Sequence, residues 1–435
     1  MILNAIFGFV ALLSAALLVW QWFAARRFPL HQRVVAHAFP PAVTLLKPLK
    51  GCEPATEDCL RSWFAQEYTG RVQILFGVAS ADDPVCEVVR KLQLDFPGID
   101  SQLVVCGPLR GANAKVAKLV ELERLAKHEL LIVSDADVRV PPDLLANIVE
   151  PLRDKAPVSD RAAAAALHPN VDASQGRARL SSARRLGLWG WWRRAEDRRA
   201  LPGGPCGLVN CFYCLANPTT RAMQWEAVAI NADFWSQVLQ AQSLKPLDFA
   251  LGAVMALRRK QLEEIGGFAA LADCLADDYQ LGNRMARRGN RIALSTVVVE
   301  CWSAPMDWAA VWKHQLRWAR TIRVCQPADY FFSILSNATL WPLLWLAVRP
   351  SAISLVAALV CWGLRIAAAL NFQSRLLRAP TVTRHSPIAV APWWMALLKD
   401  LLQAVIWLLA FAGNRIEWRG ERMRLLRDGT LGRTN

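Results

Sequence analysis

Histidine is scarce in this 435-residue sequence, with six residues in all, and none lies near the closely spaced Cys206, Cys211 and Cys214. A structural zinc site needs four His or Cys ligands at suitable spacing. The sequence therefore excludes a zinc knuckle at this group, and we expect the eleven cysteines to be buried free thiols. Because unpaired thiols suit a reducing compartment, the cytosolic side of a membrane is favoured for the domain that carries them.

Acidic residues are also few compared with basic ones, 36 against 51, which gives a formal net charge of +15. Such a charge attracts nucleic acid, an anionic membrane surface or a phosphorylated substrate. No recognised nucleic-acid-binding motif accompanies it, which argues against RNA or DNA as a partner. Two arginine-rich stretches, residues 160–199 and 414–435, hold much of the excess, and both can lie on a lipid surface.

Charge is absent altogether from residues 1–25, and Arg26 and Arg27 follow at once. This apolar run is long enough to cross a hydrocarbon core of ~30 Å. A cleaved signal peptide has its positive charge before the apolar run, so the segment is interpreted as a transmembrane anchor. The positive-inside rule then predicts an external N-terminus and a cytosolic domain after the anchor.

Short apolar runs alternate with amphipathic stretches from residue 42 to about residue 325, which indicates an α/β catalytic domain. Strands are expected at residues 43–46, 72–78, 103–106 and 130–134, with helices between them at 57–66, 85–96 and 115–125. In a doubly wound domain, ligands bind at the carboxyl ends of the strands. Residues 155–205 interrupt the pattern and are interpreted as an insertion, either a disordered surface loop or a basic, tryptophan-bearing segment on lipid headgroups.

The chain becomes apolar again at residues 329–413, where three candidate membrane segments lie at residues 331–348, 353–370 and 388–412. If all three cross fully, the basic tail at 414–435 ends outside, against the positive-inside rule. Lys399 and Asp400 divide the last segment, so a re-entrant hairpin or an interfacial helix is the alternative. We therefore expect a multi-pass membrane protein with a cytosolic tail.

Two carboxylates, Asp135 and Asp137, follow directly after the apolar strand at residues 130–134. A strand end can present such a pair to one divalent cation, Mg²⁺ or Mn²⁺, which would neutralise a diphosphate leaving group. A bare Asp-x-Asp pattern also fits a loop carboxylate or a helix cap. The pattern therefore leaves the metal site open.

Two further acidic positions have a structural and a chemical interpretation. Asp83 follows the strand at 72–78, where a carboxylate can bind a nucleotide base or ribose, but it can equally cap the helix after Pro84. Asp278 begins an amphipathic helix, where it can take the proton of an acceptor hydroxyl or simply interact with the helix dipole.

A basic, aromatic helix is predicted around residues 312–320, just before the membrane segments. Within it, His314 and Arg317 are three residues apart and can together contact phosphate oxygens. Trp318 and its neighbours also fit an interfacial helix at headgroup level, and the two roles are compatible.

The order of the motifs is stronger evidence for function than any single motif, because six of them follow one another along a single domain. They are residues 45–51 (LLKPLKG), 82–84 (DDP), 111–116 (GANAKV), 134–140 (SDADVRV), 275–279 (LADDY) and 314–318 (HQLRW). Together they resemble the ceramide glucosyltransferase family, glycosyltransferase family 21, over nearly the whole chain.

The resemblance implies an α/β GT-A fold with N- and C-terminal transmembrane helices, a UDP-sugar donor and inversion at the anomeric carbon. It assigns substrate binding to Asp83, Lys115, Asp135, His314, Arg317 and Trp318, metal binding to Asp135 and Asp137, and the catalytic base to Asp278. His314 stands where the family has Gln or Arg, although an imidazole can still donate a hydrogen bond. The insertion at 155–205 is a second departure.

The expected activity is transfer of glucose from UDP-glucose to ceramide, a membrane lipid, at the bilayer. A bacterial hopanoid N-acetylglucosaminyltransferase shares these motifs and is the close alternative. A processive polysaccharide synthase uses a similar domain and an interfacial Arg-Trp helix, although the membrane segments here are few for a polymer channel. A catalytically inactive membrane scaffold is the third class.

Overall fold

The computed structural model describes residues 2–34, 40–107, 111–153, 204–378, 390–418 and 421–433. The insertion expected at 155–205 lies outside these residues, except for its last two.

One eight-stranded mixed sheet forms the centre of the α/β domain, in the order β3-β2-β1-β4-β7-β6-β8-β5. Its strands are β1 (Val43–Pro48), β2 (Val72–Val78), β3 (Asp100–Val105), β4 (Leu130–Ser134), β5 (Val138–Arg139), β6 (Cys206–Leu215), β7 (Val254–Arg258) and β8 (Arg291–Cys301). The first four are parallel to one another, and β7 runs antiparallel between β4 and β6. The four strands expected from the sequence lie at or within a few residues of their predicted positions.

Helices cover both faces of this sheet, so its central strands are buried on both sides, as parallel strands usually are. The helices of the domain are α2 (Thr56–Phe64), α3 (Val85–Asp95), α4 (Ala114–Leu125), α5 (Leu144–Val149), α8 (Arg221–Val228), α9 (Trp235–Gln242), α10 (Arg259–Glu264) and α11 (Asp277–Arg287). Short 3₁₀ turns occur at η1 (Glu150–Leu152) and η3 (Phe268–Leu271). A π-helical turn, η2 (Ala229–Phe234), joins α8 to α9 in one continuous helical segment.

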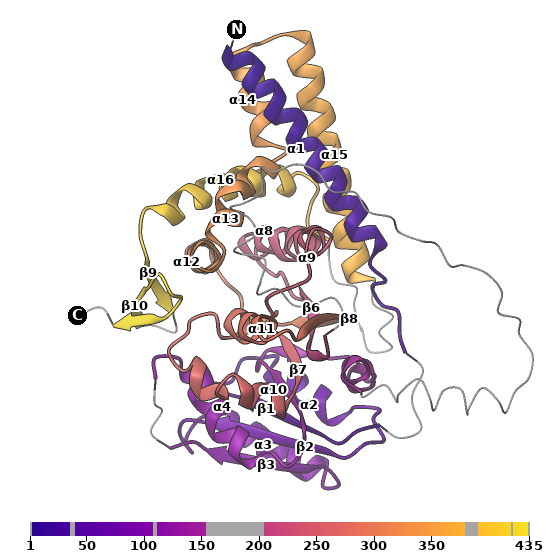
Figure 1. Cartoon of the computed structure of the whole chain (residues 1–435), viewed down its shortest axis with the longest axis vertical. Helices are drawn as coiled ribbons and strands as arrows, with labels where there is room; N and C mark the ends of the chain where they lie inside the picture. The colour runs from indigo at the N-terminus through magenta and orange to yellow at the C-terminus, as the bar shows by residue number, and fades with distance from the viewer. Residues whose placement is uncertain are drawn as a thin grey trace, which may run out of the picture.

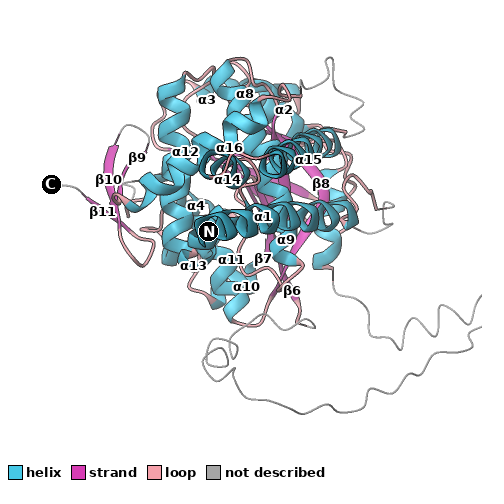
Figure 2. Cartoon of the chain, turned by 90° about the horizontal axis from the view of Figure 1, so that it is seen from above, coloured by secondary structure: helices cyan, strands magenta, loops and turns pink. Residues whose placement is uncertain are grey.

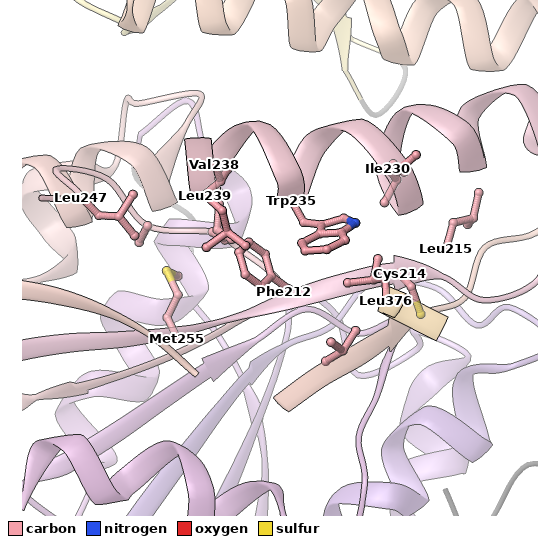
Figure 3. Close-up of a cluster of buried hydrophobic side chains, with 14 of the residues drawn as sticks. Phe212, Cys214, Leu215, Ile230, Trp235, Val238, Leu239, Leu247, Met255 and Leu376 are labelled. Atoms are coloured by element: carbon pink, nitrogen blue, oxygen red, sulfur yellow. The ribbon is translucent and has the colours of Figure 1, made fainter. Parts of the chain in front are cut away.

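The domain core continues into the apolar helices near the two ends of the chain. Trp235 of α9 packs edge-on against Phe212 of β6, with 6.0 Å between ring centroids, and Figure 3 shows this pair on the sheet. Trp235 also meets Phe372 of α15 (Ala352–Leu377) at 5.8 Å. This tryptophan therefore contacts both the sheet and α15.

Two described helices are long and apolar enough to cross a membrane, α1 (Ile2–Arg27) and α15. The bent segment formed by α13 (Pro327–Ser333), η4 (Ile334–Ser336) and α14 (Leu340–Val348), with a 57° break, would be a third if it counts as one span. Helices α1, α14 and α15 rise together from one end of the domain (Figure 1). Helix α16 (Met395–Phe411) instead crosses beneath them (Figures 1 and 2), the arrangement of an interfacial helix.

The segment expected as a basic tail folds into a three-stranded antiparallel sheet, β9 (Arg415–Trp418), β10 (Glu421–Leu425) and β11 (Leu431–Arg433). Its buried face, formed by Ile416, Met423, Leu425 and Leu431, packs on Leu275 just before α11. The polar side chains alternate with these apolar ones, as expected for a sheet with one solvated face. The C-terminal sheet is therefore anchored beside the start of α11 and next to α12 (Trp308–Cys325).

A buried ionic network joins the domain to the apolar helices. Arg365 of α15 donates to Asp233 of η2 and to both carboxylate oxygens of Asp400 of α16, at 2.8–2.9 Å. Lys399 pairs with Asp233 at 2.6 Å, and Thr339 donates to Asp400 at 2.7 Å. The two charged residues that divide the last apolar segment of the sequence therefore have buried partners, which fixes α16 between α15 and the domain.

Removing Arg365 should destabilise the whole molecule, because Arg365→Leu leaves Asp400 buried without its cationic partner. Breaking a buried ion pair in this way costs about 3–5 kcal/mol. We expect a clearly lower midpoint of thermal unfolding for the purified protein in detergent. Arg349→Leu, at an exposed arginine that ends α14, is the matched control and should unfold near the wild-type midpoint; equal midpoints for the two variants would contradict the assignment.

Candidate active site

Four carboxylates and one lysine meet where strand β4 ends and helix α11 begins. Asp135 and Asp137 follow β4, and Asp277 and Asp278 are the first two residues of α11. The lysine is Lys115, in the first turn of α4. Lys115 lies 20 to 163 positions from these acids in the sequence. It meets Asp135 because the carboxyl ends of the parallel strands β3 and β4 share one edge of the sheet, and the start of α11 packs against that edge.

Lys115 links the two acidic pairs. Its ammonium lies 2.7 Å from Oδ1 of Asp135 and 3.3 Å from Oδ2 of Asp277, and the side chain is buried. Burial opposes the ammonium charge, but the carboxylates of Asp135 and Asp277 outweigh it and raise the pKa of Lys115. The lysine is therefore a fixed positive charge at the centre of the cluster. Asn113 starts the helix by accepting hydrogen bonds from the backbone N–H groups of Lys115 and Val116, which fixes the position of the lysine.

Asp278 has the properties that a general base requires. Burial and the neighbouring Asp277 raise the pKa of Asp278 to about 6. The group is thus ionised at neutral pH, yet basic enough to accept a proton. Its Oδ1 accepts a hydrogen bond of 2.7 Å from the N–H of Tyr279, and a Cβ at Gly252 would lie 2.8 Å from its Oδ2. The glycine therefore makes room for this carboxylate.

Lys47 holds the backbone of the Asp-x-Asp turn in place through hydrogen bonds. Its fully buried ammonium donates to the hydroxyl of Ser134 at 3.3 Å and to the main-chain carbonyl of Asp135, and it lies 5.1 Å from the ring of Trp63. Burial lowers the pKa of Lys47 to about 8. Lys47 lies in the LLKPLKG motif at residues 45–51, but its contact with the turn follows only from the pairing of β1 with β4.

The Asp-x-Asp pair fits the chemistry of a divalent cation. The carboxylate of Asp135 is 40% exposed, and burial together with the charge of Asp135 raises the pKa of Asp137 to about 6. A hard cation would relieve this repulsion. No group of three or more His, Cys, Asp or Glu side chains in the described part of the chain could hold a metal. Two carboxylates are nevertheless sufficient where substrate phosphates complete the ligand set of Mg²⁺.

Asp83 lies at the same edge of the sheet, at the end of β2, but outside the four-carboxylate cluster. Its carboxylate accepts hydrogen bonds from the N–H of Gly51 at 3.0 and 3.1 Å and from the N–H of Val85 at 3.1 Å. Gly51 has a φ of 68°, a conformation that favours glycine. Asp83 therefore ties the loop after β1 to the start of α3, whose N-cap is Pro84, and it remains a candidate for nucleotide binding.

Helix α12 presents His314 to a carboxylate that the sequence did not reveal. Nδ1 of His314 lies 2.6 Å from Oε1 of Glu226, which is 1% exposed, and Gln315 donates to the same oxygen at 2.8 Å. Glu226 comes from α8, a helix for which no motif was assigned. Its contact with His314 could be found only from the packing of α8 on α12.

Trp318 lies one turn further along α12 and belongs to an aromatic row. Its ring centroid is 4.9 Å from that of His314 and 6.0 Å from that of Phe234, which in turn lies 5.5 Å from Tyr213 of β6. Burial and the charges of nearby groups, including Asp278, raise the pKa of Tyr213. The row therefore runs from the acidic cluster towards the apolar helices, since Phe234 adjoins the ionic network at Asp233.

Arg317 lies apart from this row. It lines a pocket of about 420 Å³ between α12 and the C-terminal sheet, whereas neither His314 nor Trp318 does. The sequence suggested that His314 and Arg317 share one face of the helix. The structure places them on neighbouring faces, one towards α8 and the other towards β9 and β10.

The model of the glycosyl transferase family 21 matches residues 5–166 and 200–431. The chain belongs to this family. The resemblance inferred from the six motifs is thus confirmed, as is the expected α/β GT-A fold with apolar helices near both ends of the chain.

Individual relatives within and beyond family 21 are distant. Ceramide glucosyltransferase 3 of Caenorhabditis elegans is 23% identical over 294 residues, which cover 68% of this chain and 53% of the nematode protein. Ceramide glucosyltransferase of Candida albicans is 32% identical over 118 residues, 25% of this chain and 22% of the fungal protein. Among solved structures, the mannosyltransferase PcManGT of Pyrobaculum calidifontis, in complex with GDP-Man and Mn²⁺, aligns over 92% of this chain and 99% of its own at 18% identity, with a TM-score of 0.47.

A single methyl group next to Asp278 should test the site geometry. Gly252→Ala brings a Cβ within 2.8 Å of Oδ2 of Asp278, and a carboxylate can move aside more cheaply than backbone. We expect a folded protein whose kcat falls by about 10²-fold, because a displacement of ~1 Å in an active site has that effect. Gly98→Ala, at an open position, is the control and should keep wild-type kcat and unfolding midpoint. Unchanged kcat in Gly252→Ala would argue against Asp278 as a reacting group.

Proposed function

We propose that this protein is an inverting lipid glycosyltransferase that transfers glucose from UDP-glucose to ceramide. The observation that carries the proposal is the cluster of Asp135, Lys115, Asp277 and Asp278 at the carboxyl edge of the sheet. Membership of family 21, and relatives named as ceramide glucosyltransferases, support the donor and the acceptor.

In the proposed reaction, the carboxylate of Asp278 takes the proton of the acceptor hydroxyl as that oxygen attacks the anomeric carbon of the sugar. The bond from this carbon to the diphosphate breaks in the same step, and the diphosphate leaves with its electron pair. The ammonium of Lys115 lies close enough to Asp135 to offer positive charge to the departing group. A divalent ion held by Asp135 and Asp137 would supply further positive charge to the diphosphate when bound.

The remaining substrate contacts are proposed on the same basis. Asp83 would bind the nucleoside. Arg317, which the sequence predicted to contact a phosphate, instead faces the C-terminal sheet, away from this cluster. His314 and Trp318 would contact the acceptor, because the aromatic row extends from the acidic cluster towards the apolar helices. A lipid acceptor would approach Asp278 from the bilayer along this row.

The proposed site faces the cytosol, with the protein held in the membrane by more than one segment. Arg26 and Arg27 end the first apolar helix, and positive charge is retained on the cytosolic side. All eleven cysteines are free thiols, which suits a reducing compartment.

The assay that tests this function incubates the membrane-reconstituted protein with labelled UDP-glucose or UDP-N-acetylglucosamine and with ceramide, a hopanoid lipid or no added lipid. We expect labelled glucosylceramide, and none with Asp278→Asn, which should still bind UDP-glucose because the amide keeps the shape of the carboxylate. Asp82→Asn, at an exposed neighbour of Asp83, is the matched control. A polymer, a sugar-modified hopanoid or no product at all would each refute the proposed acceptor, and full turnover in Asp278→Asn would refute the base.

A further inference from the structure

A cavity with several cationic side chains lies away from the acidic cluster, between α12 and strands β9 and β10 of the C-terminal sheet. It holds about 420 Å³ and is lined by Lys313, Leu316, Arg317, Arg320, Arg415, Ile416, Glu417 and Arg422. Five of these side chains are cationic and one is anionic. None of the four carboxylates of the active site lines it. We call it the basic pocket.

The cationic side chains of the basic pocket outnumber its one anionic side chain, Glu417. Lys313 pairs with Glu417 at 3.1 Å. Arg320 donates to the main-chain carbonyl of Arg415, but its buried Nε has no hydrogen-bond partner, and neither has the buried Nε of Arg323 one turn further along α12. Burial and the charge of Arg323 lower the pKa of Arg320. The oxygens of a phosphate can accept hydrogen bonds from guanidinium groups that lie close together in this way.

An exposed aromatic patch adjoins the basic pocket. Phe331 and Phe332 of α13 are 52% and 60% exposed, and Phe411 at the end of α16 is 42% exposed. Phe331 and Phe411 lie 6.3 Å apart, and the guanidinium of Arg323 is 5.8 Å from the ring of Phe411. Both α13 and α16 lie directly beneath the rising helices α1, α14 and α15 (Figure 1). With α1 and α15 crossing a bilayer, the patch would lie at the level where lipid headgroups meet acyl chains.

We propose that the basic pocket binds the phosphate headgroup of an anionic phospholipid of the surrounding membrane, with the acyl chains resting on the aromatic patch. A phosphate held by several cations beside an apolar surface is the recognition pattern of such a lipid. The proposed acceptor, ceramide, carries no phosphate and so does not account for the pocket. The ligand of the pocket is a membrane component that stays bound while donor and acceptor turn over.

The donor is the other candidate source of phosphate, since the sequence alone predicted a phosphate contact for Arg317, which lines the pocket. The test therefore uses the full-length protein in neutral detergent with dioctanoyl phosphatidylglycerol, dioctanoyl phosphatidylcholine and UDP as separate ligands. We expect saturable binding of phosphatidylglycerol, at least 10-fold weaker binding of phosphatidylcholine, and loss of the difference at high salt. Saturating UDP should leave the binding of phosphatidylglycerol unchanged.

Two arginines outside the proposed catalytic machinery provide the variant. Arg415→Gln combined with Arg422→Gln should weaken the binding of phosphatidylglycerol roughly 30-fold, from the usual contribution of two basic side chains near a lipid surface. Arg427→Gln, at an exposed arginine in the turn between β10 and β11 that does not line the pocket, should bind as the wild type does.

Three results would overturn the proposal. They are equal affinity of the unmodified protein for the two lipids, displacement of phosphatidylglycerol by UDP, and unchanged binding in the double variant. The first two need no variant, so the proposal stays testable even if the double variant does not fold. Because neither substrate of the transferase reaction is involved, failure here would leave the proposed function standing.

Discussion

The positive charge of Lys115 is the constraint on which the site depends. Four carboxylates, at Asp135, Asp137, Asp277 and Asp278, meet at one edge of the sheet, and their mutual repulsion would push them apart without a cation between them. Lys115 supplies that cation from the first turn of α4, at 2.7 Å from Asp135 and 3.3 Å from Asp277. This lysine reaches the acids because of the order of the strands and because α4 and α11 begin at the same edge of the sheet.

A second ionic contact sets how the site sits with respect to the apolar helices. Arg365 of α15 binds Asp233 of η2 and Asp400 of α16, and Phe234, next to Asp233, packs against Trp318 of α12. Charge pairing and aromatic packing therefore occur on adjacent residues of one helical turn. The π-helical geometry of that turn is of a kind found often at functional sites. The same turn connects the apolar block to the row that leads to the acidic cluster.

Local pattern predicted much of this structure, since β1 to β4 and the helices between them lie close to the expected positions. Local pattern does not predict contacts between residues far apart in the sequence. Glu226 meets His314, and Asp277 meets Lys115, only through tertiary packing. The strands of the C-terminal sheet could have been predicted, because apolar Ile416 and Met423 alternate with charged neighbours. The net charge of the segment suggested a basic tail instead. The sequence shows two charged residues, Lys399 and Asp400, within an apolar segment. It does not show that their partners lie on α15 and η2.

If Asp278 is the base of a single displacement, the sugar must invert as it leaves the diphosphate. The most direct measurement is the configuration of the anomeric carbon in the glycolipid product, read by proton NMR after reaction with the α-linked donor UDP-glucose. A β-linked product is the predicted result. An α-linked product would contradict the direct displacement and the role given to Asp278.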